Sequence, residues 1–252
     1  MAGIRDCWLD GSHHTAADQD VAERILVGAP HLPYSVRTYR MLLGRVVRHL
    51  VGAGVRQFLD LGSGLPTAGN VHEVAQDIDP ECRVVYVDVD PYIVTEGRDL
   101  LAGADNATIV VADLRHPAET LDAARRTAVI DWAAPVAVLM IDILHHVHDV
   151  DNPTDIVRGY LDAVCPGSHL VVAHASDDEA LVVGLALFHR FYHLPIPALT
   201  FRTPDQIAEF FKGLDSVEPG IVPVPLWRAE SGDDLGTYPE KFPGFCGLAS
   251  KP

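Results

Sequence analysis

Short apolar segments alternate with amphipathic segments along most of the chain. The apolar segments are nearly continuous in Val, Ile and Leu, as strands buried on both faces must be. They begin near Val55, Cys82, Ala107, Pro135 and Gly167. The predicted helices between them begin near Thr67, Tyr92, Pro117 and Pro153, with proline at or near a first-turn position in most cases. This alternation predicts an α/β fold, in which helices cover both faces of a mostly parallel sheet.

Two regions depart from this alternation. Residues 1–52 precede the first predicted strand, and their apolar positions recur every three to four residues, so we expect an N-terminal helical appendage. Residues 218–244 are rich in Pro and Gly and separate a predicted strand after Leu214 from the final apolar segment FCGLAS. We expect a long ordered loop there, and a main domain that spans residues 53–252.

Composition narrows the possible partners. The chain has 252 residues, 48% of them hydrophobic, and its 35 acidic and 19 basic residues give a formal net charge of -16. Such a surface repels phosphate backbones and anionic lipids, so we expect no nucleic-acid or membrane partner. The N-terminus lacks the apolar core of a signal peptide, and the four scattered cysteines form no C-x-x-C pair. We therefore expect a cytoplasmic protein; the sequence carries no signal for its oligomeric state.

The segment FLDLGSGLPTAGN, residues 58–70, takes an apolar strand into an acid and two closely spaced glycines. A dinucleotide fingerprint needs a third glycine, in the pattern G-x-G-x-x-G, and Thr67 stands at that position. The arrangement that does fit is Asp60-x-Gly62-x-Gly64, where backbone without side chains lets a ligand lie directly against the turn. The alternative is a tight strand-to-helix turn that binds nothing.

Acids also end the next two predicted strands, Asp88 in VVYVDVDP and Asp113 in VVADLR. Each alone can be a helix cap, but three acids at three consecutive strand ends favour a ligand site. With this order of motifs the sequence resembles the class I S-adenosylmethionine-dependent methyltransferases. The resemblance implies a Rossmann-like seven-stranded sheet and S-adenosyl-L-methionine as the methyl donor. The donor-binding residues that it implies here are Asp60, Gly62 and Gly64 in the loop, Asp88 for the ribose with Val89 next to it, and Asp113 and Leu114 for the adenine.

The fourth predicted strand ends in MIDILHHVHD. The resemblance implies that Asp142 and Ile143 line the donor and that His145 or His146 faces the methyl acceptor. If the acceptor is a hydroxyl, one of these histidines is the candidate base, because an unperturbed imidazole titrates near neutrality. If the acceptor is already nucleophilic, neither is needed, and a polar loop that caps the next helix is the alternative. We expect no metal at His145, His146, His148 and Asp149, because adjacent histidines point in different directions and rarely converge on one ion.

The likeness to one narrower S-adenosyl methyltransferase family, largely uncharacterised and formerly classed as a domain of unknown function, extends from WLDGSHHTAADQDVAE to GLASKP. It implies transfer of a methyl group to a small molecule of unidentified structure. Arg40 matches an arginine of the family pattern and is a candidate for the donor's carboxylate, and we expect residues 1–52 to wall the acceptor pocket. Two alternatives stay open. One is a nicotinamide-dependent oxidoreductase, which Thr67 and Asp113 disfavour, and the other is a non-catalytic protein that binds S-adenosylmethionine or S-adenosylhomocysteine.

Overall fold

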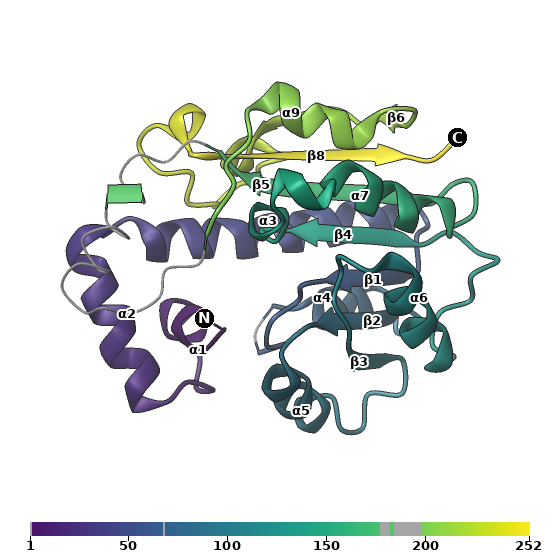
Figure 1. Cartoon of the computed structure of the whole chain (residues 1–252), viewed down its shortest axis with the longest axis horizontal. Coiled ribbons are helices and arrows are strands. Elements are labelled where there is room, and N and C mark those ends of the chain that lie inside the picture. The colour runs from purple at the N-terminus through teal and green to yellow at the C-terminus, as the bar shows by residue number, and fades with distance from the viewer. Residues whose placement is uncertain (1, 68, 177–181, 184–197) are drawn as a thin grey trace.

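A computed structural model gives the structure of the chain and describes residues 2–67, 69–176, 182–183 and 198–252. Within these ranges it shows one mixed sheet in the order β3-β2-β1-β4-β5-β8-β6, with β7 also paired to β8 (Figure 1). The parallel strands are β1 (Gln57–Leu61), β2 (Arg83–Asp88), β3 (Ala107–Val111), β4 (Ala137–Ile141) and β5 (His169–Ala175). Each lies within an apolar segment that the sequence pattern predicts to be a strand, so the α/β fold is confirmed.

The last three strands close one edge of the sheet. β8 (Gly244–Ser250) runs antiparallel to β5, and its other edge pairs first with β7 (Val222–Pro223) and then with β6 (Asp215–Ser216). These two-residue strands share one position in the sheet. Over the described residues the sheet therefore has eight strands in seven positions, in keeping with the seven-stranded sheet that the resemblance implies.

Helices cover both faces of the sheet. Alternate residues of a strand point to opposite faces, so Phe58 lies in one core cluster and Leu59 in the other. The first cluster includes residues of α4 (Val71–Ile78) and α5 (Pro91–Leu100), and the second includes residues of α6 (Pro117–Arg126) and α7 (Pro153–Asp162). α5, α6 and α7 each begin at a proline, which has no N–H to leave unpaired in the first turn.

Three helices form the N-terminal region: α1 (Ala2–Trp8), α2 (Ala16–Gly28) and α3 (Leu32–Gly52). α1, α2 and the start of α3 have a small apolar cluster of their own, which includes Trp8 and Ile25. The later turns of α3 instead pack into the main core, where Leu42, Val46 and Leu50 have no exposed surface. Figure 1 shows α1 and α2 beside the end of the sheet toward which the β4 arrow points. The N-terminal region therefore stands next to the carboxyl ends of the parallel strands.

The Pro- and Gly-rich segment before β8 is an ordered loop. It contains the short 3-10 helices η4 (Val224–Leu226) and η5 (Pro239–Lys241), and it buries Trp227 completely. The guanidinium of Arg45 on α3 donates hydrogen bonds to the carbonyls of Val224 and Pro225 and to Asp233. A buried cation with backbone acceptors thus fixes this loop against the N-terminal region.

Candidate active site

The glycine loop after β1 has a backbone shape that glycine adopts most readily. Gly62 and Gly64 lie in the left-handed region, with φ of 73° and 64°. A Cβ on Gly62 would come within 2.3 Å of Ile143 Cγ1, so this glycine lets the segment after β4 pack against the loop. For a Cβ on Gly64, no heavy atom of the described residues lies within 4 Å. The loop therefore packs against the segment after β4 at Gly62, and at Gly64 it leaves open space for a ligand.

Asp60 lies buried at the end of β1, with 6% of its surface exposed. Burial raises the pKa of its carboxyl to about 7, with the positive charge of Arg40 acting to lower it and the charge of Asp88 to raise it. This carboxyl therefore changes protonation near neutral pH. A cation placed beside it would favour its ionised form.

Asp88 connects the end of β2 to the glycine loop. Its Oδ2 accepts a hydrogen bond from Gly64 N at 2.9 Å, and its Oδ1 accepts one from Asp90 N at 2.9 Å. Asp90 is the N-cap of α5, because its carboxylate accepts from Tyr92 N. A carboxylate has about four lone-pair positions, so Asp88 keeps acceptor capacity for a further ligand.

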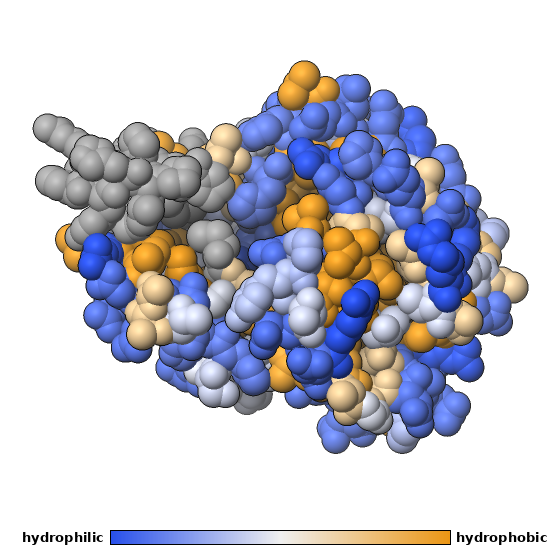
Figure 2. All heavy atoms as spheres, turned by 60° about the horizontal axis from the view of Figure 1, so that its bottom comes forward, coloured by the Kyte–Doolittle hydropathy of each residue, from blue (hydrophilic) through white to orange (hydrophobic). Residues whose placement is uncertain are grey.

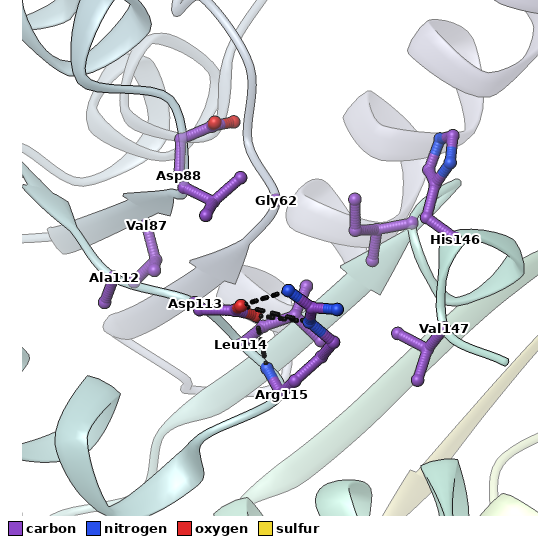
Figure 3. Close-up of a pocket in the computed structure, with 11 residues that line it drawn as sticks. Gly62, Val87, Asp88, Ala112, Asp113, Leu114, Arg115, His146 and Val147 are labelled. Carbon is purple, nitrogen blue, oxygen red and sulfur yellow. Dashed lines mark hydrogen bonds and ion pairs between the residues drawn. The ribbon is translucent and has the colours of Figure 1, made fainter. Parts of the chain in front are cut away.

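Asp113, two residues beyond the end of β3, forms a forked ion pair with Arg115. Arg115 Nη2 lies 2.6 Å from Asp113 Oδ2, and Arg115 Nε lies 3.0 Å from each carboxylate oxygen (Figure 3). The hydrogen bonds from Arg115 hold the pKa of Asp113 below its ordinary value. Between them, Leu114 accepts a hydrogen bond from Tyr160 at its carbonyl. The sequence argument did not include Arg115, although an arginine two residues after the acid is a visible signal.

A pocket of about 270 Å³ joins the ends of the first four strands. Its lining is Gly62, Val87, Asp88, Val89, Ala112, Asp113, Leu114, Arg115, Ile143, His146 and Val147. Figure 3 shows Asp88 and His146 on opposite sides of it, with Gly62 between them. The pocket thus brings together seven of the twelve predicted site residues. Asp60, Asp142 and His145 are not among the lining residues, and Gly64 and Arg40 line a neighbouring pocket.

Asp142 follows β4 in a left-handed conformation, with φ of 57°, which is uncommon for a residue other than glycine. Its Oδ2 lies 2.5 Å from Nη1 of Arg5 on α1. Burial acts to raise the pKa of Asp142, but the charge of Arg5 and its hydrogen bond act in the opposite direction, and the pKa is lowered overall. Asp142 is therefore an ionised carboxylate that binds a cation from the N-terminal region.

The two adjacent histidines occupy different environments. His145 is buried, with Nδ1 3.6 Å from Asp142 Oδ1, and burial lowers its pKa to about 3. His146 lines the pocket, and partial loss of hydration lowers its pKa too, against the opposing effect of Asp142. Both imidazoles are neutral at pH 7. His146 is consequently the one whose ring is available to a molecule in the pocket.

Arg40 on α3 is directed at the start of α4, where its Nη1 donates to Asn70 Oδ1 at 2.5 Å. Burial lowers the pKa of Arg40, as does the charge of Arg5, with Asp60 opposing them. A second pocket of about 40 Å³ lies between α1 and the glycine loop, and Arg5, Arg40 and Gly64 line it. The sequence argument missed Arg5, because its only signal was a place on an N-terminal amphipathic segment.

A further hollow, of about 330 Å³, is lined by residues that include Asp149, Arg202 and Phe210. Figure 2 shows a face that is mainly hydrophilic, with apolar side chains gathered near its centre. Over the described ranges, no helix combines the length and the apolar character that a bilayer crossing needs. Nor do the described residues place three or more His, Cys, Asp or Glu side chains where they could hold a metal ion.

The sequence model of one family, described as S-adenosyl methyltransferase, matches residues 1–252. The chain belongs to this S-adenosyl methyltransferase family. Among solved structures it is similar to a DUF574 family protein from Streptomyces avermitilis, with 37% identity, a TM-score of 0.89, and coverage of 100% of this chain and 97% of that one. It is also similar to a putative methyltransferase from Thermobifida fusca, with 36% identity, a TM-score of 0.87, and coverage of 100% and 94%. No curated protein matches the sequence.

More distant structures share the fold. The N-methyltransferase NodS from Bradyrhizobium japonicum has 15% identity and a TM-score of 0.50 over 85% of this chain and 97% of its own. As a member of the S-adenosyl methyltransferase family, the chain described here uses S-adenosyl-L-methionine as its methyl donor. It also has the mostly parallel sheet of that class. The nicotinamide-dependent alternative has no support among these relatives, in agreement with Thr67 at the third glycine position.

Proposed function

We propose that this methyltransferase transfers the methyl group of S-adenosylmethionine to a small molecule, with the donor seated across the carboxyl ends of β1, β2 and β3. The observation that carries the proposal is the pocket that joins Gly62, Asp88 and Asp113 on one wall to His146 on another. In an open α/β sheet, ligands bind in the crevice outside the carboxyl ends of the strands. The hydrogen-bond acceptors Asp88 and Asp113, which suit a ribose and an adenine, line one part of this cleft, and His146 lines another. Such a cleft suits a methyl donor and a methyl acceptor bound side by side.

The residues present fit such a donor. Gly64 leaves open space where any other residue would place a side chain, and Asp88 stands beside it with acceptor capacity to spare for two ribose hydroxyls. Asp113 is held ionised by Arg115 and is suited to accept from an exocyclic amino group, and Leu114 offers a backbone N–H next to it. Val89 lies at the rim of the same pocket.

The amino-acid end of the donor carries a carboxylate and an ammonium group. Arg40 and Arg5 line the small pocket beside Gly64, where either could bind the carboxylate. Asp60 and Asp142 supply negative charge nearby, which suits the ammonium group and the sulfonium. Ile143 packs on Gly62 and gives the apolar contact between these groups.

When bound, S-adenosylmethionine supplies a methyl group that its sulfonium already activates for attack by a nucleophile. The chain's own residues must therefore mainly orient the acceptor and exclude water, effects that can supply about 7 to 11 kcal/mol. For a hydroxyl acceptor, neutral His146 can take the proton at an imidazole nitrogen, which typically adds about 10²- to 10⁴-fold. His145, buried behind it, would act through the orientation of Asp142.

The N-terminal region is proposed as the remaining wall. The Arg5–Asp142 ion pair joins α1 to the end of β4, and Arg37 on α3 donates to the carbonyl of Trp8, which ties α1 to α3. Residues 1–52 therefore close the side of the cleft that the sheet leaves open. We also place the protein in the cytoplasm, on the four free cysteines, and expect its acidic surface to avoid nucleic acids and membranes.

Calorimetric titration of the chain with S-adenosylhomocysteine and, separately, with NAD tests the donor site. We expect saturable binding of the first and none of the second. A panel of small hydroxyl, amine and activated-carbon acceptors with isotopically labelled donor then tests methyl transfer. Binding of S-adenosylhomocysteine with no transfer to any acceptor class would favour the non-catalytic alternative, and preferential binding of NAD would overturn the proposal.

A further inference from the structure

The loop Leu144–Asp149, which carries both histidines, is held by a short segment far away in the sequence. Thr200 N donates a hydrogen bond to the carbonyl of His145 at 2.8 Å, and Thr200 Oγ1 lies 2.8 Å from His148 Nδ1. Two residues later, Arg202 approaches the same loop from the same side. The loop's own backbone hydrogen bonds are those of short turns, such as Val147 N to the Leu144 carbonyl, so these contacts add to what holds its shape.

Arg202 is a buried cation, with 4% of its surface exposed. Its two terminal nitrogens reach four acceptors. They are the Leu144 carbonyl at 2.9 Å, the Val147 carbonyl at 2.8 Å, Asp149 Oδ1 at 2.7 Å and His174 Nε2 at 2.8 Å. The first three belong to the histidine loop, and Leu144 and Val147 flank the two histidines directly. A planar guanidinium with fixed donor directions can hold two carbonyls at a set separation, which a lysine ammonium cannot do.

His174 anchors the guanidinium to the sheet. It lies at the end of β5 with no exposed surface, and burial lowers its pKa to about 4. Because Nε2 faces the Arg202 donor, the imidazole proton is on Nδ1, which donates to the Ala175 carbonyl at 2.6 Å. Phe210 lies over the guanidinium, 5.7 Å from its ring centroid to Arg202 Cζ, and excludes water from it. Arg202 therefore bridges a rigid strand and the histidine loop.

We propose that Arg202 is a positioning residue of the methyl-transfer site, which holds the loop Leu144–Asp149 so that His146 faces the pocket and His145 stays against Asp142. The proposal rests on the proposed function for its catalytic meaning. Arg202 itself lines a different hollow, on the side of the loop with Asp149 and Phe210, and is absent from the lining of the donor pocket. Its effect must therefore pass through the loop.

The test compares Arg202→Lys with Arg126→Lys, an identical chemical change at an exposed position on α6. Histidine side-chain ¹⁵N spectra follow the titration of His146 and the tautomer of His174, and amide exchange follows residues 144–149. The groups that act on His146 are Asp142, Arg5 and His148, with the His145 ring 4.3 Å away, and all of them stay in both variants. In Arg202→Lys we expect the pKa of His146 to rise toward that of free histidine, the Nδ1–H tautomer of His174 to lose its dominance, and exchange in the loop to quicken roughly tenfold or more.

Arg126→Lys should leave all three readouts unchanged, and S-adenosylhomocysteine affinity should stay within about threefold in both variants. If Arg202→Lys does not fold, Asp149→Asn replaces it, because this change weakens the exposed ion pair between Arg202 and the loop. Asp151→Asn is its control. An Arg202→Lys protein that folds with wild-type His146 titration and loop exchange would overturn the proposal. Failure of the wild type to bind S-adenosylhomocysteine would instead count against the proposed function, and the spectra would still decide the role of Arg202.

Discussion

Arg5 and Asp142 are 137 positions apart, and their side chains meet at 2.5 Å over the end of β4. The contact brings the first helix of the chain to the edge where parallel strands present their ligands. The backbone of Asp142, which binds this cation, is in the left-handed conformation. Strained residues of this kind cluster at functional sites. The pair makes the N-terminal region part of the site and gives the first prediction.

Donor binding is expected to protect the N-terminal region from hydrogen exchange. A ligand beside Gly64 would contact the small pocket that Arg5 and Arg40 line, so amides of residues 5–40 should exchange more slowly with S-adenosylhomocysteine present. The helix α6, on the other side of the sheet, is the internal control. Arg5→Gln should reduce the added protection. Equal exchange with and without the ligand would mean that the N-terminal helices only pack against the domain.

Asp88→Ala should weaken donor binding. The variant loses charge-assisted hydrogen bonds worth about 1.5 to 3 kcal/mol, or roughly 10- to 150-fold in affinity for S-adenosylhomocysteine by calorimetry. Asp90→Ala is the matched control, because Asp90 caps α5 and should cost about 0.5 to 2 kcal/mol of stability with little change in affinity. Unchanged affinity in Asp88→Ala would remove the ribose assignment.

Gly64→Ala should separate folding from binding. The Cβ meets open space among the described residues, so its cost to folding is the left-handed backbone alone, about 1 kcal/mol. Gly213→Ala carries the same kind of cost away from the pocket, at φ of 83°. Similar melting temperatures for the two variants, with donor affinity lost only in Gly64→Ala, would support the open face of the loop as the donor's seat. Retained affinity in Gly64→Ala would contradict it.

Asp60 is expected to make folding stability fall as pH rises toward 7 and above. Its pKa is about 7 in the folded chain against 3.8 for an exposed carboxyl, so the folded state binds the extra proton between these values. The stability that this proton contributes is complete below pH 3.8 and is lost as pH rises through 7. Asp60→Asn removes the titration and keeps the shape. In urea unfolding at pH 5, 6, 7 and 8, the free energy of unfolding of the variant should rise relative to that of the wild type as pH rises. A constant difference between the two across this range would show that Asp60 does not titrate in it.

Methyl transfer to a hydroxyl acceptor should depend on the protonation of His146. Its pKa is lowered, so the neutral, proton-accepting form persists below pH 6.5, and the rate should fall only when pH drops further. His146→Ala should lose this dependence and about 10²- to 10⁴-fold in rate, with S-adenosylhomocysteine affinity kept. Asp151→Ala, an exposed change nearby, serves as control. Full activity in His146→Ala would leave the histidine as a loop residue.

Much of the fold was readable from local pattern. Short continuous apolar segments rich in Val and Ile favour strands buried on both faces, and prolines mark the starts of α5, α6 and α7 because their geometry suits a first turn. The number of strands was less readable, because β6 and β7 are two residues each and exist only through their pairing with β8. A pairing partner is a long-range fact that no local pattern contains.

The candidate site divides in the same way. The glycine loop and the acids Asp88 and Asp113 could be placed from sequence, because parallel strands bring their carboxyl ends to one edge and the acids follow those strands directly. Sequence also placed His145 and His146 together, but only burial distinguishes them, leaving one imidazole in the pocket and one behind it.

What sequence by itself determined was therefore the sheet and its ligand edge, since these follow from periodicity and from residues adjacent to strand ends. The class of ligand came from the resemblance of the motifs to a known family. Tertiary structure alone decided which distant cations meet that edge. Arg5 reaches Asp142 and Arg202 reaches the Leu144 and Val147 carbonyls because the fold brings together segments separated by more than fifty residues. An arginine looks the same in sequence whether it is solvated or buried, and only the surrounding core, which removes water and supplies acceptors, gives it a role.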